Sequence, residues 1–105
     1  MKKVNILGTE YSIEIDNTLE KTKLDGLCKE YDKRISIRNA GSMLNDEDST
    51  GVKKIRFDEV LRHEIIHAFF YESGLDDYSG NEQLVDWIAK QFPKLEKAFK
   101  EAGCL

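Results

Sequence analysis

The first 38 residues alternate between apolar and polar side chains in short runs. Alternation with a period of two places the apolar side chains on one face of an extended strand, so it predicts strands that bury one face. We expect a first hairpin that turns at Gly8-Thr9 and buries the apolar positions on either side, namely Val4, Ile6, Tyr11, Ile13 and Ile15.

A second stretch repeats this pattern. Residues 24–28 and 35–38 are rich in apolar side chains and flank a charged segment, 29–34, that is suited to a turn. We predict a second hairpin there, and a short helix over residues 19–31 is the alternative.

The period changes after residues 39–51, whose turn-forming and acidic side chains are typical of a loop. A helix is predicted over residues 55–73, because Ser73-Gly74 supplies a stop signal and the apolar residues before it recur at helical spacing, at Leu61, Ile65, Ala68 and Phe69.

Two further helices are expected after a loop at residues 75–80. The first spans 81–91, and Pro93 is expected to break it and to begin a last helix that runs through Ala102 and ends at Gly103. Leu84, Val85, Ile88, Ala89, Leu95 and Phe99 are predicted to face inward, and the aromatic residues Phe69, Phe70, Trp87 and Phe92 to pack between the helices. Strands followed by helices predict one α+β domain over residues 1–105, in which N-terminal β-hairpins form a small antiparallel or mixed sheet.

Composition excludes several classes of function. The 105 residues carry a formal charge of −4 with no basic stripe, which argues against nucleic acid as a partner. No apolar run approaches the length of a membrane span or of a secretory signal, so we expect a cytoplasmic protein without a membrane partner. The two cysteines, Cys28 and Cys104, fit that reducing compartment as free thiols, and a disulfide between them is the minor alternative.

The predicted helix at 55–73 contains the sequence His63-Glu64-Ile65-Ile66-His67. Histidines four residues apart share one face of a helix and can bind one metal ion, and imidazole nitrogen is a preferred zinc ligand. Glu64 is rotated by about a hundred degrees from His63, so it can reach a water molecule beside the ion as a base. The chain has only two histidines, and chance would give this motif in about 0.2% of such chains, so a zinc site is favoured over two histidines that only pack in the core.

A catalytic zinc site normally has three protein ligands, and the third must here be a carboxylate or a cysteine. Glu82 and Asp86 are four residues apart near the start of the next helix, so they share a face that can approach the histidines. The alternatives are a solvated helix cap at these two residues, or a ligand among Glu72, Asp76 and Asp77.

Together, His63-Glu64-x-x-His67 and Asn81-Glu82-x-x-x-Asp86 resemble the paired motif of the gluzincins, the thermolysin-like zinc peptidases. The longer segment 57–92 also resembles small zincin-like proteins of bacteria and prophages, near the ImmA/IrrE-type metallopeptidases. The resemblance implies a minimal zincin fold with Zn²⁺ on His63, His67 and Glu82, and with Asp86 hydrogen-bonded to His63.

This resemblance implies hydrolysis of a peptide or protein, with Glu64 as the general base. In zincins the substrate lies along an edge strand, for which residues 35–38 are the expected candidate. Tyr71, Tyr78 and Arg62 are the nearby candidates for a donor to the transition state, and Arg62 is otherwise expected in a surface salt bridge. The rival hypotheses are a non-catalytic phage or host regulatory protein with a structural zinc that acts by binding a partner, and a metal-dependent hydrolase of another substrate class.

Overall fold

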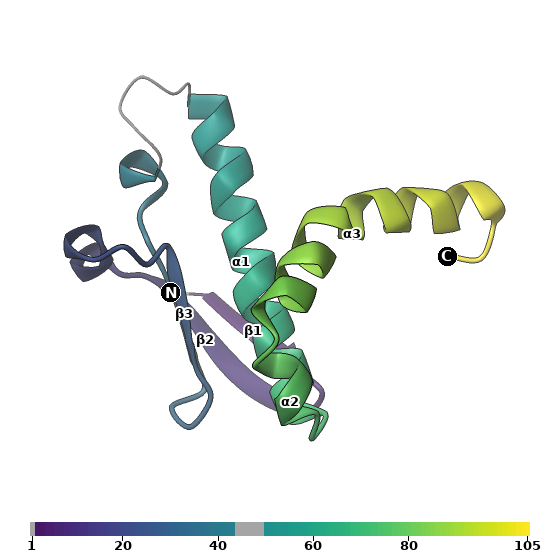
Figure 1. Ribbon diagram of the computed structural model, residues 1–105, viewed down its shortest axis with the longest axis horizontal. Coiled ribbons are helices and arrows are strands. Elements are labelled where there is room, and N and C mark those ends of the chain that lie inside the picture. The colour runs from purple at the N-terminus through teal and green to yellow at the C-terminus, as the bar shows by residue number, and fades with distance from the viewer. Residues whose placement is uncertain (1, 44–49) are drawn as a thin grey trace.

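Four short strands form one mixed sheet in the N-terminal part of the chain (Figure 1). The computed structural model describes residues 2–43 and 50–105, so part of the predicted loop at 39–51 lies outside the described residues. The strands are β1 (Lys2–Ile6), β2 (Thr9–Ile15), β3 (Gly26–Lys29) and β4 (Arg34–Ile37). The α+β architecture with N-terminal strands is thus confirmed.

The order of the strands across the sheet is β1-β2-β4-β3. β1 pairs with β2, and β3 with β4, in the two antiparallel hairpins that the alternation predicts, and β2 runs parallel to β4. The alternative helix at 19–31 is wrong, because only the short 3-10 helix η1 (Asn17–Lys21) forms there before β3. The substrate strand predicted at 35–38 needs correction as well: β4 is paired on both sides, whereas β3 lies at the edge of the sheet.

The helices follow the sheet. After the short 3-10 helix η2 (Ala40–Ser42), α1 (Thr50–Glu72) begins earlier than predicted. The short helix α2 (Asp76–Ser79) lies within the predicted loop. One helix, α3 (Glu82–Ala102), replaces the two helices predicted on either side of Pro93. One face of the sheet packs against α1, and the buried core between them consists of Ile6, Tyr11, Ile35, Ile37, Met43, Val60 and Ala68. Cys28 packs against this core, and both cysteines are free thiols.

A network of polar contacts at Glu72 fixes the C-terminal end of α1 to the sheet. The carboxylate accepts hydrogen bonds from Thr9 Oγ1 at 2.9 Å, from Tyr11 Oη at 2.6 Å and from Lys33 Nζ at 2.9 Å. The bond from Tyr11, followed by those from Lys33 and Thr9, lowers the pKa of Glu72 to about 2, so it stays ionised at neutral pH. Glu72 is therefore an anchor of the fold and is wrong as an alternative metal ligand.

Pro93 lies inside α3 and bends the helix without ending it (Figure 1). Proline has no N–H group, so it cannot donate to the carbonyl oxygen four residues earlier, which belongs to Ala89. Arg62 of α1 supplies the missing donor, because its Nε lies 2.8 Å from Ala89 O. The predicted surface salt bridge of Arg62 is therefore wrong: its guanidinium satisfies α3 at the bend.

Several side chains that were predicted to be inward are exposed. Phe69, Trp87, Phe92, Leu95 and Phe99 all keep a large share of their surface accessible, whereas Phe70 is half-buried against Tyr78 at 5.8 Å between ring centres. For Phe92, Leu95 and Phe99 the reason is the bend, at and after which α3 points away from the sheet (Figure 1). Phe69 lies on α1 and Trp87 lies before the bend, so the bend does not account for their exposure. Within the described residues, no helix has the length and hydrophobicity needed to cross a bilayer.

The pairing of Arg62 with the bend makes a testable prediction. Arg62→Met should lower the free energy of unfolding by about 1–3 kcal/mol, because a partly buried carbonyl loses its donor. In a Pro93→Ala background a backbone N–H can replace that donor, so the same substitution should cost less. Denaturant unfolding of the four proteins in this double-mutant cycle checks the coupling, and equal costs in both backgrounds would contradict it.

Candidate metal centre

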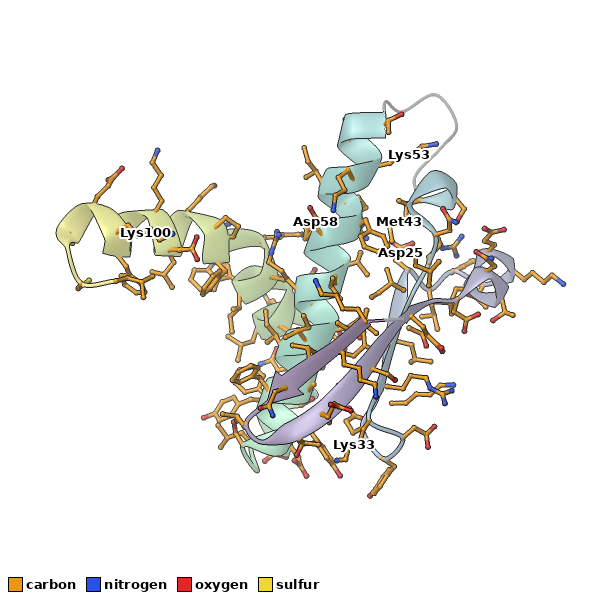
Figure 2. All side chains as sticks on the ribbon, turned by 180° about the vertical axis from the view of Figure 1, so that it is seen from behind. Asp25, Lys33, Met43, Lys53, Asp58 and Lys100 are labelled. Carbon is orange, nitrogen blue, oxygen red and sulfur yellow. The ribbon has the colours of Figure 1, made fainter. Side chains whose placement is uncertain are left out.

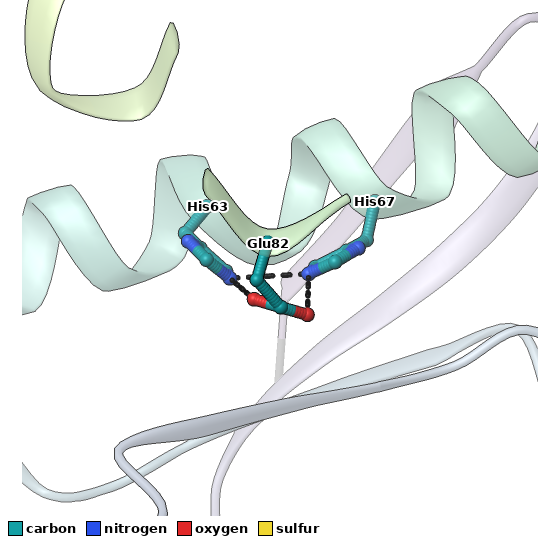
Figure 3. Close-up of side chains that lie close together, drawn as sticks. All are labelled: His63, His67 and Glu82. Carbon is teal, nitrogen blue, oxygen red and sulfur yellow. Dashed lines mark hydrogen bonds and ion pairs between the residues drawn. The ribbon is translucent and has the colours of Figure 1, made fainter. Parts of the chain in front are cut away.

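Two helices bring three electron-pair donors to one point (Figure 3). His63 and His67 come from consecutive turns of α1, and Glu82 is the first residue of α3. Glu82 Oε2 lies 3.0 Å from His63 Nε2, its Oε1 lies 3.0 Å from His67 Nε2, and the two Nε2 atoms are 3.1 Å apart. Asn81 fixes the start of α3, because its side-chain oxygen accepts a hydrogen bond from Leu84 N at 3.0 Å.

The outer nitrogen of each histidine has its own partner. His63 Nδ1 lies 3.0 Å from Asp86 Oδ1, a carboxylate that can only accept, so this ring nitrogen carries the proton. His67 Nδ1 lies 3.3 Å from Ser79 Oγ, whose hydroxyl donates to the carbonyl oxygen of His67 at 3.1 Å. The Ser79 oxygen is thus left to accept from His67 Nδ1. Both Nε2 atoms then carry lone pairs in the neutral rings.

In these tautomers the lone pairs face each other and a carboxylate, an arrangement that one shared cation would hold together. Donor atoms around a tetrahedral zinc ion, with bonds of 2.0–2.1 Å, lie about 3.3–3.4 Å apart, close to the 3.0–3.1 Å separations here. Two imidazoles and one carboxylate are also a known ligand set of catalytic zinc. The residues present therefore fit a zinc ion, and that His63, His67 and Glu82 bind one stays a prediction.

Glu64 lies beside this cluster on α1 and is 7% exposed. Within the described residues no side chain or backbone group hydrogen-bonds to its carboxylate, so it remains available to a water molecule or a substrate. Burial raises the pKa of Glu64 to about 7; a positive charge on His63 would lower it, and the carboxylates of Glu82 and Glu30 raise it further. A divalent cation beside Glu64 would favour its ionised form.

A groove of about 710 Å³ connects these groups to the edge strand. One wall is β3 with the residues before it, and the other is formed by α1, by α2 and by the start of α3. Gly26 allows the close approach of β3, because a Cβ atom there would lie 2.8 Å from Val60 Cγ1 and 3.0 Å from Glu64 Oε2. His63, Glu64 and His67 all line this groove.

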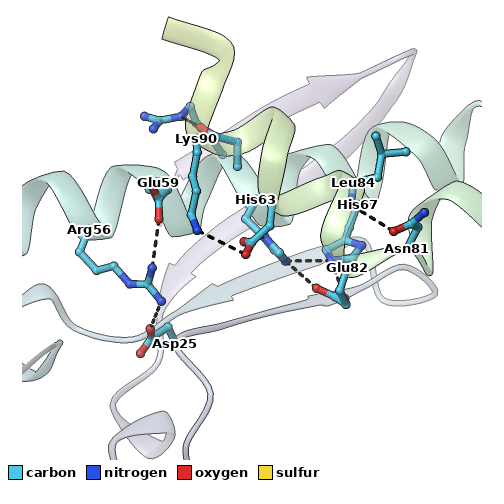
Figure 4. A network of polar contacts seen from close by, with 12 residues as sticks. Asp25, Arg56, Glu59, His63, His67, Asn81, Glu82, Leu84 and Lys90 are labelled. Carbon is cyan, nitrogen blue, oxygen red and sulfur yellow. Dashed lines mark hydrogen bonds and ion pairs between the residues drawn. The ribbon is translucent and has the colours of Figure 1, made fainter. Parts of the chain in front are cut away.

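Ion pairs hold the outer part of the groove (Figure 4). The Arg56 guanidinium bridges Asp25 of the segment before β3 at 2.8 Å and Glu59 of α1 at 3.0 Å. On the other side, Lys90 Nζ lies 3.7 Å from the second oxygen of Asp86, the residue that holds His63. Of these pairs, Arg56–Asp25 joins α1 to the segment before β3, whereas Arg56–Glu59 lies within α1 and Lys90–Asp86 within α3.

The remaining sequence candidates occupy different places. Tyr71 lines the groove, whereas Tyr78 packs on Phe70 outside it. Asp76 also lines the groove but does not join the cluster of three ligands, and Asp77 lies away from it. Cys28 lines the groove too, but burial, followed by the nearby Glu30 and Glu64 carboxylates, raises the pKa of its thiol to about 12. A thiol in this state is a poor metal ligand, because metals bind the thiolate.

Two residues of the site, Ser79 and Gly26, are not predicted by the sequence analysis. Ser79 lies twelve positions after His67 in a segment expected to be a loop, and no spacing rule singles it out. Gly26 carried a usable signal, because a glycine inside a predicted strand often marks the close approach of another element.

Comparison with known proteins does not identify the site. Comparisons of the chain with protein-family models, with curated proteins and with solved structures found no match. The chemistry of the site therefore rests on the arrangement of His63, Glu64, His67, Glu82 and Asp86.

Proposed function

We propose that this chain is a zinc-dependent peptidase of the gluzincin type, with His63, His67 and Glu82 as zinc ligands and Glu64 as the general base. One observation carries the proposal: three electron-pair donors from α1 and α3 meet at 3.0–3.1 Å, and Asp86 and Ser79 hold both imidazoles with their lone pairs directed to that point.

A bound zinc ion would supply Lewis-acid chemistry, which lowers the pKa of water to about 7 and polarises a carbonyl group. The residues of the chain would do the rest. Asp86 and Ser79 hold the histidines in the tautomer that can bind a metal. Glu64 would take a proton from water at its carboxylate and pass it to the leaving amine, since no protein group competes for that carboxylate within the described residues.

The edge of the sheet supports a peptide as the substrate. β3 lies at the edge, lines the groove and passes next to Glu64 at Gly26. An extended peptide can pair with such an edge through its backbone, which would place one of its carbonyl groups near the ligand cluster. β3 therefore replaces residues 35–38 in the proposal, and Tyr71 is the remaining candidate for a donor to that carbonyl.

The number of ligands favours catalysis over a purely structural zinc. Structural sites are usually closed by four protein ligands, whereas catalytic sites leave a fourth position open. Among the described residues, the only group of three or more potential ligands is His63, His67 and Glu82. A general base next to an open coordination position can serve hydrolysis, whereas it has no role in a zinc site that only stabilises the fold.

Substitutions of Glu82 and Asp86 should lower the affinity for zinc by different amounts. Glu82→Ala should weaken zinc binding by more than about 100-fold, because it removes a ligand and a charge, whereas Asp86→Ala should cost about 10–100-fold by releasing the His63 ring. Asp76→Ala is the matched control, since Asp76 lines the same groove without reaching the cluster, and it should bind zinc like the wild type. Competition titration with a chromophoric chelator measures all three, and equal, mild effects at Glu82 and Asp86 would reduce the pair to a solvated helix cap.

Glu64→Gln should keep zinc and lose hydrolysis. Glutamine preserves the shape of the side chain but cannot accept the proton, so metal binding and chemistry should separate. The matched control is Glu59→Gln, the same change in α1 at a residue that lines the groove and pairs with Arg56. Cleavage of a mixed peptide library, read by mass spectrometry, gives the activity. Survival of cleavage in Glu64→Gln would refute the mechanism, and a zinc-loaded wild type that cleaves nothing would favour the regulatory alternative.

A further inference from the structure

The two ends of the groove differ in how their charges are paired. Figure 2 shows Asp25 and Lys33 at opposite ends of the sheet, and the groove extends from the segment that carries Asp25 to the turn that carries Lys33. At the first end, the Asp25 carboxylate pairs with Arg56 at 2.8 Å. At the second end, the turn between β3 and β4 contributes Glu30 to the groove, and the start of α2 contributes Asp76.

Glu30 and Asp76 lie on opposite walls of this second end. Successive side chains of a strand alternate between its two faces, so Glu30, two residues after Cys28, shares the face of Cys28 that lines the groove. The pKa of the Cys28 thiol is raised by burial and next by the Glu30 carboxylate, which agrees with a charge beside the groove. Tyr71 of α1 lines the groove as well. We name the part lined by Glu30, Tyr71 and Asp76 the acidic end.

The two carboxylates of the acidic end have no cationic partner. Within residues 2–43 and 50–105, neither Glu30 nor Asp76 forms an ion pair or a side-chain hydrogen bond. The other acidic residues of the groove pair with Arg56 or with a histidine, or lie beside the proposed zinc. The acidic end therefore carries two negative charges that the described part of the protein leaves unbalanced.

A buried carboxylate in the same groove indicates that the groove receives a ligand. Glu64 is 7% exposed and lines the groove, and within the described residues its carboxylate has no hydrogen-bond partner. Buried polar groups nearly always have a partner, so an unpartnered one points to a molecule that enters from outside. The Lys33 ammonium, 5.0 Å from the centre of the Tyr71 ring, is paired with Glu72 at 2.9 Å and does not line the groove, so its charge is balanced.

We infer that the acidic end binds the lysine or arginine side chain of an extended peptide, an inference that rests on the peptidase function proposed above. Tyr71 follows His67 by one helical turn, or about 6 Å, and an extended peptide rises about 3.3 Å per residue. The first or second residue from the scissile bond can therefore reach the acidic end. The apolar stem of a lysine would lie along Tyr71, while its ammonium group would meet Glu30 and Asp76.

Peptide affinity tests the inference without depending on cleavage. The probes are two dye-labelled decapeptides that differ at one central residue, which is lysine in one and norleucine in the other, because norleucine keeps the apolar stem and lacks the charge. Fluorescence anisotropy with zinc-loaded Glu64→Gln should give a Kd about 3- to 10-fold lower for the lysine peptide, the effect of two partly exposed ion pairs. This preference should shrink between about 0.05 M and 0.5 M salt, because salt screens such pairs.

Two pairs of substitutions locate the preference. Glu30→Gln with Asp76→Asn, in the same Glu64→Gln protein, should bind both peptides equally. Asp32→Asn with Asp77→Asn is the matched control, because it removes the same charge from neighbouring positions that do not line the groove, and it should keep the preference for lysine. Zinc titration checks that both variants are folded, since none of these four residues belongs to the ligand cluster.

Cleavage by the wild type separates this inference from the proposed function. In the mixed peptide library, lysine and arginine should be enriched at the first or second residue on one side of the cleaved bonds. A wild type that cleaves nothing, while the lysine peptide still binds more tightly, would refute the peptidase and support the cationic subsite. Cleavage without basic enrichment, equal affinity for the two peptides, no binding of the lysine peptide up to about 1 mM, or a preference that survives the substitutions at Glu30 and Asp76 would overturn the inference.

Discussion

The crossing of α1 and α3 is the constraint on which the site depends. The first turn of α3 must lie against the middle of α1 for Glu82 to reach both histidines at 3.0 Å. Contacts on both sides of the crossing hold it there. Arg62 donates to Ala89 where Pro93 has removed a backbone donor, and Ser79 joins the ring and the carbonyl of His67 to the end of α2. A break in either contact would move a ligand rather than only loosen the fold.

The sheet forms the wall of the groove that faces α1. Its buried face fixes α1 through Val60 and Ala68, and its edge strand closes on Glu64 because Gly26 has no side chain. The groove therefore lies between a helix that carries the ligands and a strand with an open edge. The strand order sets this arrangement, because β4 pairs with β2 on one side and with β3 on the other, which leaves β3 outermost.

Local patterns were enough to predict most of the elements and the principal residues of the site. Alternation identified both hairpins, and the spacings of His63 with His67 and of Glu82 with Asp86 predicted which side chains would meet. Tertiary features were missed. Pro93 was expected to end a helix, but Arg62, a residue 31 positions earlier, satisfies the freed carbonyl. Strand order depends on long-range packing, so the local pattern at residues 35–38 cannot show that β3, and not β4, lies at the edge. Helical periodicity does not reveal the bend of α3, so it predicts Phe92 and Phe99 in the core although both are exposed.

The most direct test is an X-ray absorption spectrum at the zinc edge of the full chain loaded with one equivalent of zinc. Two histidines and one carboxylate predict nitrogen and oxygen neighbours at about 2.0–2.1 Å, with the outer-shell scattering of two imidazole rings. His67→Ala should remove the signal of one ring or abolish binding. A sulfur neighbour at about 2.3 Å, or a spectrum without imidazole scattering, would contradict a metal centre built from His63, His67 and Glu82.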